Sequence, residues 1–440
     1  MDRPGAEKGE EVATADRGLS MRSAVLRRGV FYGWWIVAAG FIVQMFVSGI
    51  GTHSGGLYLV VLQDEFGWSK ALISAAFALG TIEAAVLAPF QGRLVDRFGP
   101  RAVVRTGVII MTLGLVTISL ISSRWHLYIS SVLIGLGYTL AFDVALQTAV
   151  VNWFKKKRGT AMGLMMAGFG AGGVLVPGMA LMVAMFEWRR TALIAGIVLL
   201  AVGLAAAQLI KRSPEEHGQL PDGVTNDGQK ADQASDERDE DREFTTRQAL
   251  RTPTFWLLAA GQALFMFGVT AVGMHLVPHA SESLGLPLTA AGSLMTALTV
   301  SIVAGQVGGG FVADKVDKRK FMVLYTFVQT GILALLAFGT SLWVLALFVV
   351  AQGLIVGARA PLNLALRADY FGRKAYGTIW GVSLLVVNAG NMAGMVLTGY
   401  LADRFGGYQT AFVLLMGLTG LSAVLLALVR RPKAPATVTG

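Results

Sequence analysis

The sequence predicts an all-α membrane protein with twelve transmembrane helices in two pseudo-symmetric six-helix bundles. Two observations carry this prediction. The chain of 440 residues is 54% hydrophobic and only 15% charged, with a mean hydropathy of +0.60, whereas a water-soluble globule carries about 25% charged residues. In addition, the second half of the chain repeats features of the first half in register.

The repeat is clearest in a short motif of a glycine, three further residues, an aspartate and a basic residue. Its two copies are Gly92-Arg-Leu-Val-Asp96-Arg97 and Gly310-Phe-Val-Ala-Asp314-Lys315. Superposing the copies also aligns Gly159-Thr160 with Gly377-Thr378, and Gly163 with Gly381. A duplicated half within so apolar a chain is typical of a membrane transporter.

Long apolar segments define the individual helices, because a bilayer-spanning helix needs about 20 mostly apolar residues. Twelve segments qualify: 31–53, 70–91, 103–122, 126–150, 160–185, 190–210, 254–279, 288–312, 321–339, 342–366, 377–401 and 408–429. The resulting organisation is an N-terminal tail (1–30), a first bundle (31–210), a linker (211–252), a second bundle (253–430) and a C-terminal tail (431–440).

The connections between these helices alternate in charge. One set is rich in Lys and Arg, at 93–105, 155–158, 315–320 and 373–374, and the other set is short and mixed in sign. The positive-inside rule assigns the basic set, and with it both termini, to the cytoplasm. We therefore expect a multi-pass protein of the plasma membrane, as in the inner membrane of a bacterium. The net charge of +10 then reflects topology, and no nucleic-acid partner is expected.

The linker at 211–252 interrupts the apolar texture and contains the charged run Asp236–Glu243. Such a composition is typical of a solvated tether between two bundles. A regulatory role for the charged run is the alternative interpretation.

Several chemistries are not predicted. The chain has no cysteine and five histidines without a ligand cluster, which predicts no metal site. No glycine-rich nucleotide loop ending in Gly-Lys-Ser or Gly-Lys-Thr occurs. We therefore expect a monomer that needs no cofactor and is not an enzyme, with the lipid bilayer as its environment.

The paired glycine–aspartate loops, the twelve helices and the central linker resemble the major facilitator superfamily across nearly all of residues 30–430. Within it, Tyr32-Gly33-Trp34-Trp35 is similar to the opening of the first helix in the monocarboxylate transporters and the oxalate and formate exchangers. The segment Asn152–Thr160 after the fourth helix is similar to bacterial members. This resemblance implies a secondary transporter for a small organic anion.

The paired loops predict a gate on the cytoplasmic side. Their aspartates can accept charge-assisted hydrogen bonds from an arginine or a helix N-terminus of the other half, and such contacts can latch one conformation. The candidate gating residues are Asp96, Arg97, Arg101, Asp314, Lys315 and Arg319. The alternative for their basic members is that they only enforce topology.

Charged residues at membrane depth usually face a cavity and carry function, because burying each costs roughly 2.5–3.5 kcal/mol. Arg359 in the tenth helix and Asp143 in the fourth lie on helices that line the central path in the superfamily fold. A guanidinium can hold a carboxylate through two hydrogen bonds, so Arg359 is the first candidate for substrate binding. Asp143 could be its counter-ion or a proton carrier, and a structural ion pair is the alternative.

Other polar residues inside the helices are weaker candidates. Glu83 is a second candidate proton carrier, or else a neutral carboxyl within the helix packing. His53 falls about where many animal monocarboxylate transporters carry a lysine involved in proton and substrate binding, and histidine can hold a proton near neutral pH. Further candidates for hydrogen bonding the substrate are His275, Tyr138 and Asn363.

One departure weakens the carboxylate assignment. The resembling families carry a substrate-binding arginine in the eighth helix, and residues 288–312 contain no cation. If the substrate is an anion, Arg359 must replace that group. The leading hypothesis is a proton-coupled symporter of a small carboxylate that works by alternating access. The alternatives are a proton-antiporting exporter of drugs or metabolites and, less favoured, a membrane sensor or enzyme.

Overall fold

In the computed structural model the described residues are 31–217, 219–223, 243–283, 285, 288–339 and 341–433. The predicted N-terminal tail, the part of the linker from 224 to 242 and the end of the C-terminal tail lie outside them. These described residues form helices and connecting turns without any strand, which confirms the predicted all-α class.

The first bundle contains six crossings. Its helical elements are α2 (Gly33–Val47), the π-helical η1 (Ser48–His53), α3 (Gly55–Phe66), α4 (Lys70–Phe98), α5 (Pro100–Ser119), α6 (Arg124–Phe142), α7 (Val144–Trp153), α8 (Arg158–Ala171), the 3-10 turn η2 (Gly172–Val174) and α9 (Leu175–Leu209). The elements α2, η1 and α3 together form one crossing with local breaks, and so do α6 and α7. Helix α9 bends sharply at Glu187 (φ 65°) and turns back, so that it takes part in two crossings.

The second bundle repeats this plan. After short turns at Glu215–His217 (η3) and Pro221–Gly223 (η4) and the helix α11 (Thr246–Leu250), it contains α12 (Pro253–Pro278), η6 (His279–Ser283), α13 (Leu288–Ala313), α14 (Lys318–Phe338), α15 (Leu342–Phe371), α16 (Tyr376–Phe405) and α17 (Gln409–Leu428). Within the described residues, ten spans are long and apolar enough to cross a membrane; one of them holds both arms of the α8–α9 hairpin. With α4, the arms number twelve.

Local sequence signals set the helix ends. The side chains of Ser69, Ser123 and Ser341 accept hydrogen bonds from the first turns of α4, α6 and α15, as expected for N-caps. Glycine ends α4 at Gly99 (φ 81°) and α15 at Gly372 (φ 79°), because positive φ is strained for other residues.

Several helices extend further than the sequence predicted, and two of them do so by seven residues or more. The first crossing does not end at residue 53 but continues through η1 and α3 to Phe66, since the glycine-rich stretch forms a π-helical segment instead of a turn. Helix α4 continues past residue 91 to Phe98. Asp96 therefore lies on the last turn of a helix, and Asp314 follows directly after α13.

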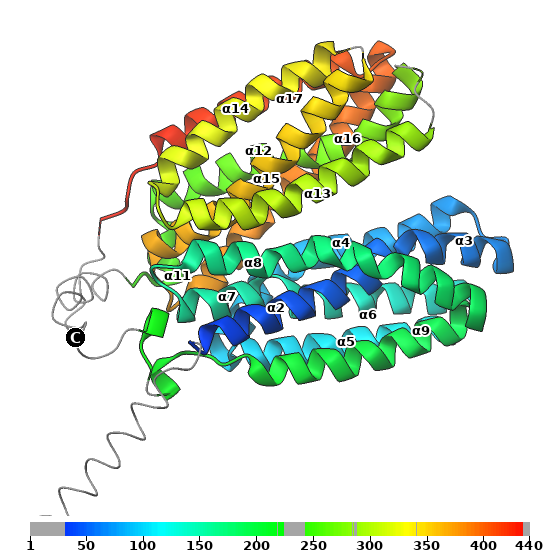
Figure 1. The fold of residues 1–440 in the computed structure, drawn as a ribbon, viewed down its shortest axis with the longest axis horizontal. Coiled ribbons are helices and arrows are strands. Elements are labelled where there is room, and N and C mark those ends of the chain that lie inside the picture. The colour runs from blue at the N-terminus through cyan, green and yellow to red at the C-terminus, as the bar shows by residue number, and fades with distance from the viewer. Residues whose placement is uncertain are drawn as a thin grey trace, which may run out of the picture.

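The two bundles approach each other at one end. We call it the basic end, because the Lys- and Arg-rich segments 93–105, 155–158, 315–320 and 373–374 lie there together with the described ends of the linker. Figure 1 shows the bundles close together at this end, near α7, α8 and α11, and diverging toward the other end. The contact between them is made mainly by α8 against α13 and by α4 against α16, with further contacts of α15 against α8.

Glycines permit this contact. A side chain at Gly163 would clash with the backbone of Gln306, and one at Gly381 would clash with that of Ala88. The equivalent positions of the two halves therefore bring their helices into backbone contact. Farther from the basic end, the face of the α8–α9 arm that continues from Gly163 is exposed, with Val174 at 75% and Leu181 at 61%. The bundles are thus closed at the basic end and separated beyond it.

Candidate functional site

The two motif aspartates each bind the N-terminus of a helix in the opposite bundle. The carboxylate of Asp96 accepts hydrogen bonds from the backbone N–H groups of Gly377 (3.2 Å) and Thr378 (2.9 Å) at the start of α16, and from the Thr378 hydroxyl (2.5 Å). Asp314 accepts from the N–H groups of Gly159 (2.7 Å) and Thr160 (2.9 Å) at the start of α8.

These two contacts are equivalent under the internal repeat. Gly159-Thr160 and Gly377-Thr378 are the pair that aligns when Gly92 is placed on Gly310. Each aspartate therefore binds the other half's copy of one element. A carboxylate at a helix N-terminus satisfies free N–H groups and interacts favourably with the helix dipole. We call the two contacts the aspartate locks.

The basic residues of the motif stay within their own bundles. Arg101 donates to the side chain of Gln208 near the end of α9, and Arg319 donates to the carbonyl of Ala427 near the end of α17. Arg97 lies over the ring of Phe98 at 5.2 Å, and Lys315 is exposed. Among the described residues of the motif, the aspartates therefore make the hydrogen bonds that join the two bundles.

A further ion pair crosses between the bundles. Arg158, at the start of α8, is buried and donates to Asp369 of α15 at 2.7 Å. Lys318 of α14 holds the second oxygen of Asp369 at 2.8 Å. In the sequence, Arg158 stands out only as part of the basic connection 155–158, and no local pattern links it to Asp369, because the two residues are distant in the chain.

The two described ends of the linker dock onto equivalent loops. Asp222 accepts from the backbone N–H groups of Lys155 (2.9 Å) and Lys156 (2.6 Å) before α8. Glu243 accepts from those of Arg373 (3.3 Å) and Lys374 (2.8 Å) before α16. These described ends are therefore part of the closed basic end.

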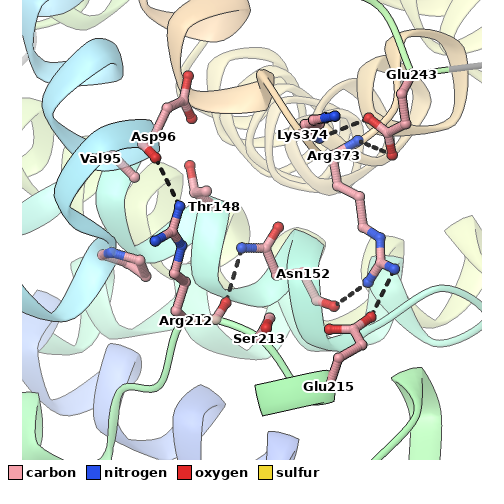
Figure 2. A pocket seen from close by; sticks show the side chains of 11 residues that line it. Val95, Asp96, Thr148, Asn152, Arg212, Ser213, Glu215, Glu243, Arg373 and Lys374 are labelled. Carbon is pink, nitrogen blue, oxygen red and sulfur yellow. Dashed lines mark hydrogen bonds and ion pairs between the residues drawn. The ribbon is translucent and has the colours of Figure 1, made fainter.

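A polar pocket of about 500 Å³ lies between the bundles and the linker (Figure 2). Arg212 donates to the Asp96 carbonyl at 3.1 Å, and Arg373 donates both to the Asn152 carbonyl at 3.0 Å and to Glu215 at 2.8 Å. These cationic side chains are held by protein groups, so the pocket reinforces the closed end.

Arg359, the first candidate for substrate binding, is a buried residue of α15. Arg359 is 1% exposed, and it donates from Nη1 to Gln262 of α12 (2.6 Å) and from Nε to Thr326 of α14 (3.1 Å). Its guanidinium carbon lies 3.6 Å from the centre of the Phe265 ring. Among the described residues its Nη2 has no hydrogen-bond partner, and no carboxylate pairs with it.

A sequence profile of the Major Facilitator Superfamily matches residues 39–278 and 258–440. The chain belongs to the major facilitator superfamily. Similar proteins include the oxalate:formate antiporter of Oxalobacter formigenes, 27% identical over 90% of each chain. Another is monocarboxylate transporter 13 of Bos taurus, 27% identical over 87% of this chain and 85% of that one.

Solved structures of transporters share the fold. The fucose:proton symporter FucP of E. coli covers 90% of this chain and 100% of its own, with a TM-score of 0.68 and 15% identity. The human organic anion transporter MFSD10 covers 90% of this chain and 99% of its own, with a TM-score of 0.68 and 16% identity. This chain is therefore a major facilitator protein in both sequence and architecture, and the four similar proteins named here are transporters.

In this major facilitator chain the counter-ion hypothesis for Asp143 does not match the observed contacts. Asp143 lies at the break between α6 and α7 and accepts a hydrogen bond from Gln147, one turn along its own helix. Among the described residues no ion pair joins it to Arg359. The Arg359 side chain points toward α12 and α14 of its own bundle, so the rotation of α15 about its axis turns this side chain away from Asp143.

The remaining candidates are dispersed. His53 donates to the Phe169 carbonyl at 3.0 Å, which joins η1 to the end of α8, and His275 donates to the Met395 carbonyl at 3.0 Å. The Tyr138 ring stacks on Phe142 at 4.7 Å. Asn363, one turn from Arg359, and Glu83, beside Gly135, each have a buried carboxamide or carboxyl oxygen without a partner in the described part.

Sequence reasoning missed a set of buried polar groups on the halves of α15 and α16 that lie nearer the basic end. Arg367, on the part of α15 near the basic end, is only 3% exposed. Tyr376 and Trp380 were not singled out. Their signal is the one-turn spacing on α16, but in a membrane helix that spacing is also typical of ordinary aromatic packing.

Proposed function

We propose that this major facilitator protein transports a small carboxylate across the plasma membrane by alternating access. The observation that carries the proposal is Arg359, a buried guanidinium with one unpartnered donor and no carboxylate partner in the described chain. A buried charge without a partner is costly, and a carboxylate is the ligand whose geometry suits its donors. The oxalate:formate antiporter and monocarboxylate transporter 13 support the same substrate class by their names.

The conformation supports an outward-open state of the carrier. If the basic end is cytoplasmic, as the positive-inside rule indicates, then the bundles are closed to the cytoplasm and separated on the outer side. The substrate enters from outside, and release of the aspartate locks opens the inner side. Arg359 binds the anion, with His275, Tyr138, Asn363 and His53 as additional polar groups on the helices of the path.

Binding of carboxylates is tested by the melting temperature of the purified protein. A ligand that binds only the folded state stabilises it, by about 2.7 kcal/mol at a concentration of 100 Kd. We expect oxalate, formate or longer monocarboxylates to raise the melting temperature, followed by accumulation of the same acid in proteoliposomes. Stabilisation by lipophilic cations alone, without carboxylate uptake, would favour a drug exporter and reject the proposal.

Proton symport is the coupling that we propose, with Asp143 or Glu83 as the proton carrier. Each carboxylate that enters then removes a proton from the outside medium. Adding substrate to proteoliposomes should therefore make the external medium more alkaline, and collapse of an inward proton gradient should slow uptake. The measurement is external pH with a soluble indicator during uptake, with protein-free liposomes as the control. Uptake at unchanged external pH would exclude proton symport while leaving carboxylate transport intact.

A further inference from the structure

A second buried arginine lies two turns along α15 from Arg359. Arg367 donates from Nη1 to the Ser383 hydroxyl (2.5 Å) and from Nη2 to the Leu258 carbonyl (3.3 Å). Its guanidinium carbon is 4.4 Å from the centre of the Trp380 ring. Its Nε has no hydrogen-bond partner in the described chain, and no carboxylate there forms an ion pair with it.

Two more unpartnered donors accompany this arginine. The Tyr376 hydroxyl and the Trp380 indole N–H lack partners among the described residues, and both side chains are buried. Tyr376, Trp380 and Ser383 are spaced i, i+4 and i+7 on α16, which places them on one face of the helix. An indole and a guanidinium only donate hydrogen bonds, so the group missing from this cluster is an acceptor.

The cluster belongs to the interface between the bundles. Tyr376 and Trp380 pack into the apolar core of the first bundle, together with Leu364 and Ala368 of α15. Helices α15 and α16 contact α7 at this level. Tyr376 directly precedes Gly377, where Asp96 locks α16. Separation of the bundles at the basic end would therefore uncover the cluster.

We propose that Arg367, Tyr376 and Trp380 form a second carboxylate subsite, which the substrate occupies when the basic end opens. The proposal rests on the proposed carboxylate transport. Eight residues of α-helix separate the two arginines, a rise of about 12 Å along the axis. Arg359, Asn363 and Arg367 follow one another at intervals of one turn. An anion released by Arg359 thus meets a second guanidinium on the same helix before it leaves.

Cysteine labelling tests this subsite directly, because the chain contains no cysteine. The variant Ser383→Cys places a single thiol beside Arg367. We expect an anionic thiosulfonate reagent to modify it about tenfold faster than a cationic one, since a cation concentrates anions in a cleft. Oxalate or formate should slow the anionic reaction. In the double variant Ser383→Cys with Arg367→Gln, the preference for the anionic reagent and the protection by carboxylates should both disappear. The control is Leu120→Cys at the exposed end of α5 that lies away from the basic end, where neither effect is expected.

The outcomes separate this subsite from the transport function. Equal rates for both reagents and no protection by carboxylates, in protein that still accumulates them, would reject the subsite alone. Absence of carboxylate uptake by the unmodified protein would reject both proposals. If Ser383→Cys fails to fold, Tyr376→Phe and Trp380→Phe replace it, because each removes one donor and keeps an aromatic ring. Efflux slowed several-fold in both, with ligand-induced stabilisation unchanged, supports the subsite, and unchanged efflux overturns it.

Discussion

Replacement of Arg359 by glutamine is expected to weaken carboxylate binding and uptake strongly while the protein still folds. Glutamine keeps a polar side chain near Gln262 and Thr326 but removes the charge and the planar fork that suits a carboxylate. The fold should tolerate the change, because a buried charge without a counter-ion is itself unfavourable. Loss of a charge-assisted contact costs ~1.5–3 kcal/mol, so affinity should fall by roughly 10- to 100-fold.

Uptake in proteoliposomes and the melting temperature with and without substrate together check this expectation. Arg359→Lys retains the charge but not the fork and should recover only part of the affinity. Arg105→Gln is the matched control, because Arg105 is exposed on α5. Wild-type uptake by folded Arg359→Gln would remove the anion-binding role.

Replacing Asp96 and Asp314 by asparagine should shift the carrier toward the state that is open at the basic end. Asparagine keeps the shape of the side chain but loses the charge that binds the free N–H groups of α16 and α8. If each lock contributes ~1.5–3 kcal/mol, a single variant changes the population of the open state roughly 10- to 100-fold. The two locks lie on separate helix pairs, so their effects should be approximately additive.

The single cysteine variant Thr148→Cys reports this opening, since Thr148 is buried and lines the pocket at the basic end. Its labelling by a membrane-impermeant reagent from that side should accelerate in each asparagine variant and most in the double variant. Asp317→Asn is the control, because Asp317 caps α14 within its own bundle. Labelling that is equally slow in all variants would show that the aspartates do not hold the end closed.

The sequence was informative where a pattern of residues has one structural explanation. Apolar length predicted the helical arms, and the repeat of Gly92 at Gly310 predicted that the halves are equivalent. The same alignment also contained Gly159-Thr160 and Gly377-Thr378. It did not reveal that these are the partners of Asp314 and Asp96, because a contact between halves leaves no spacing pattern within either half.

The orientation of the buried charges could not be predicted. In a soluble helix the polar face marks the solvent side, but lipid and protein core are both apolar, so a membrane helix gives little indication of its rotation. The sequence therefore could not show that the Arg359 side chain contacts helices of its own bundle, or that the Arg367 side chain is buried. Asp143 was assigned a distant partner for the same reason, although its actual partner, Gln147, is one turn away.

The aspartate locks leave an asymmetric target for mutation. Their donors are mostly backbone N–H groups, which substitution of a side chain cannot delete, whereas each acceptor is one carboxylate. A side chain at Gly159 or Gly377 would clash with the carboxylate of the lock. Substitution of either glycine, or of either aspartate, should therefore weaken a lock. Inherited variation that alters how fast this protein cycles should therefore concentrate at these two aspartates and two glycines.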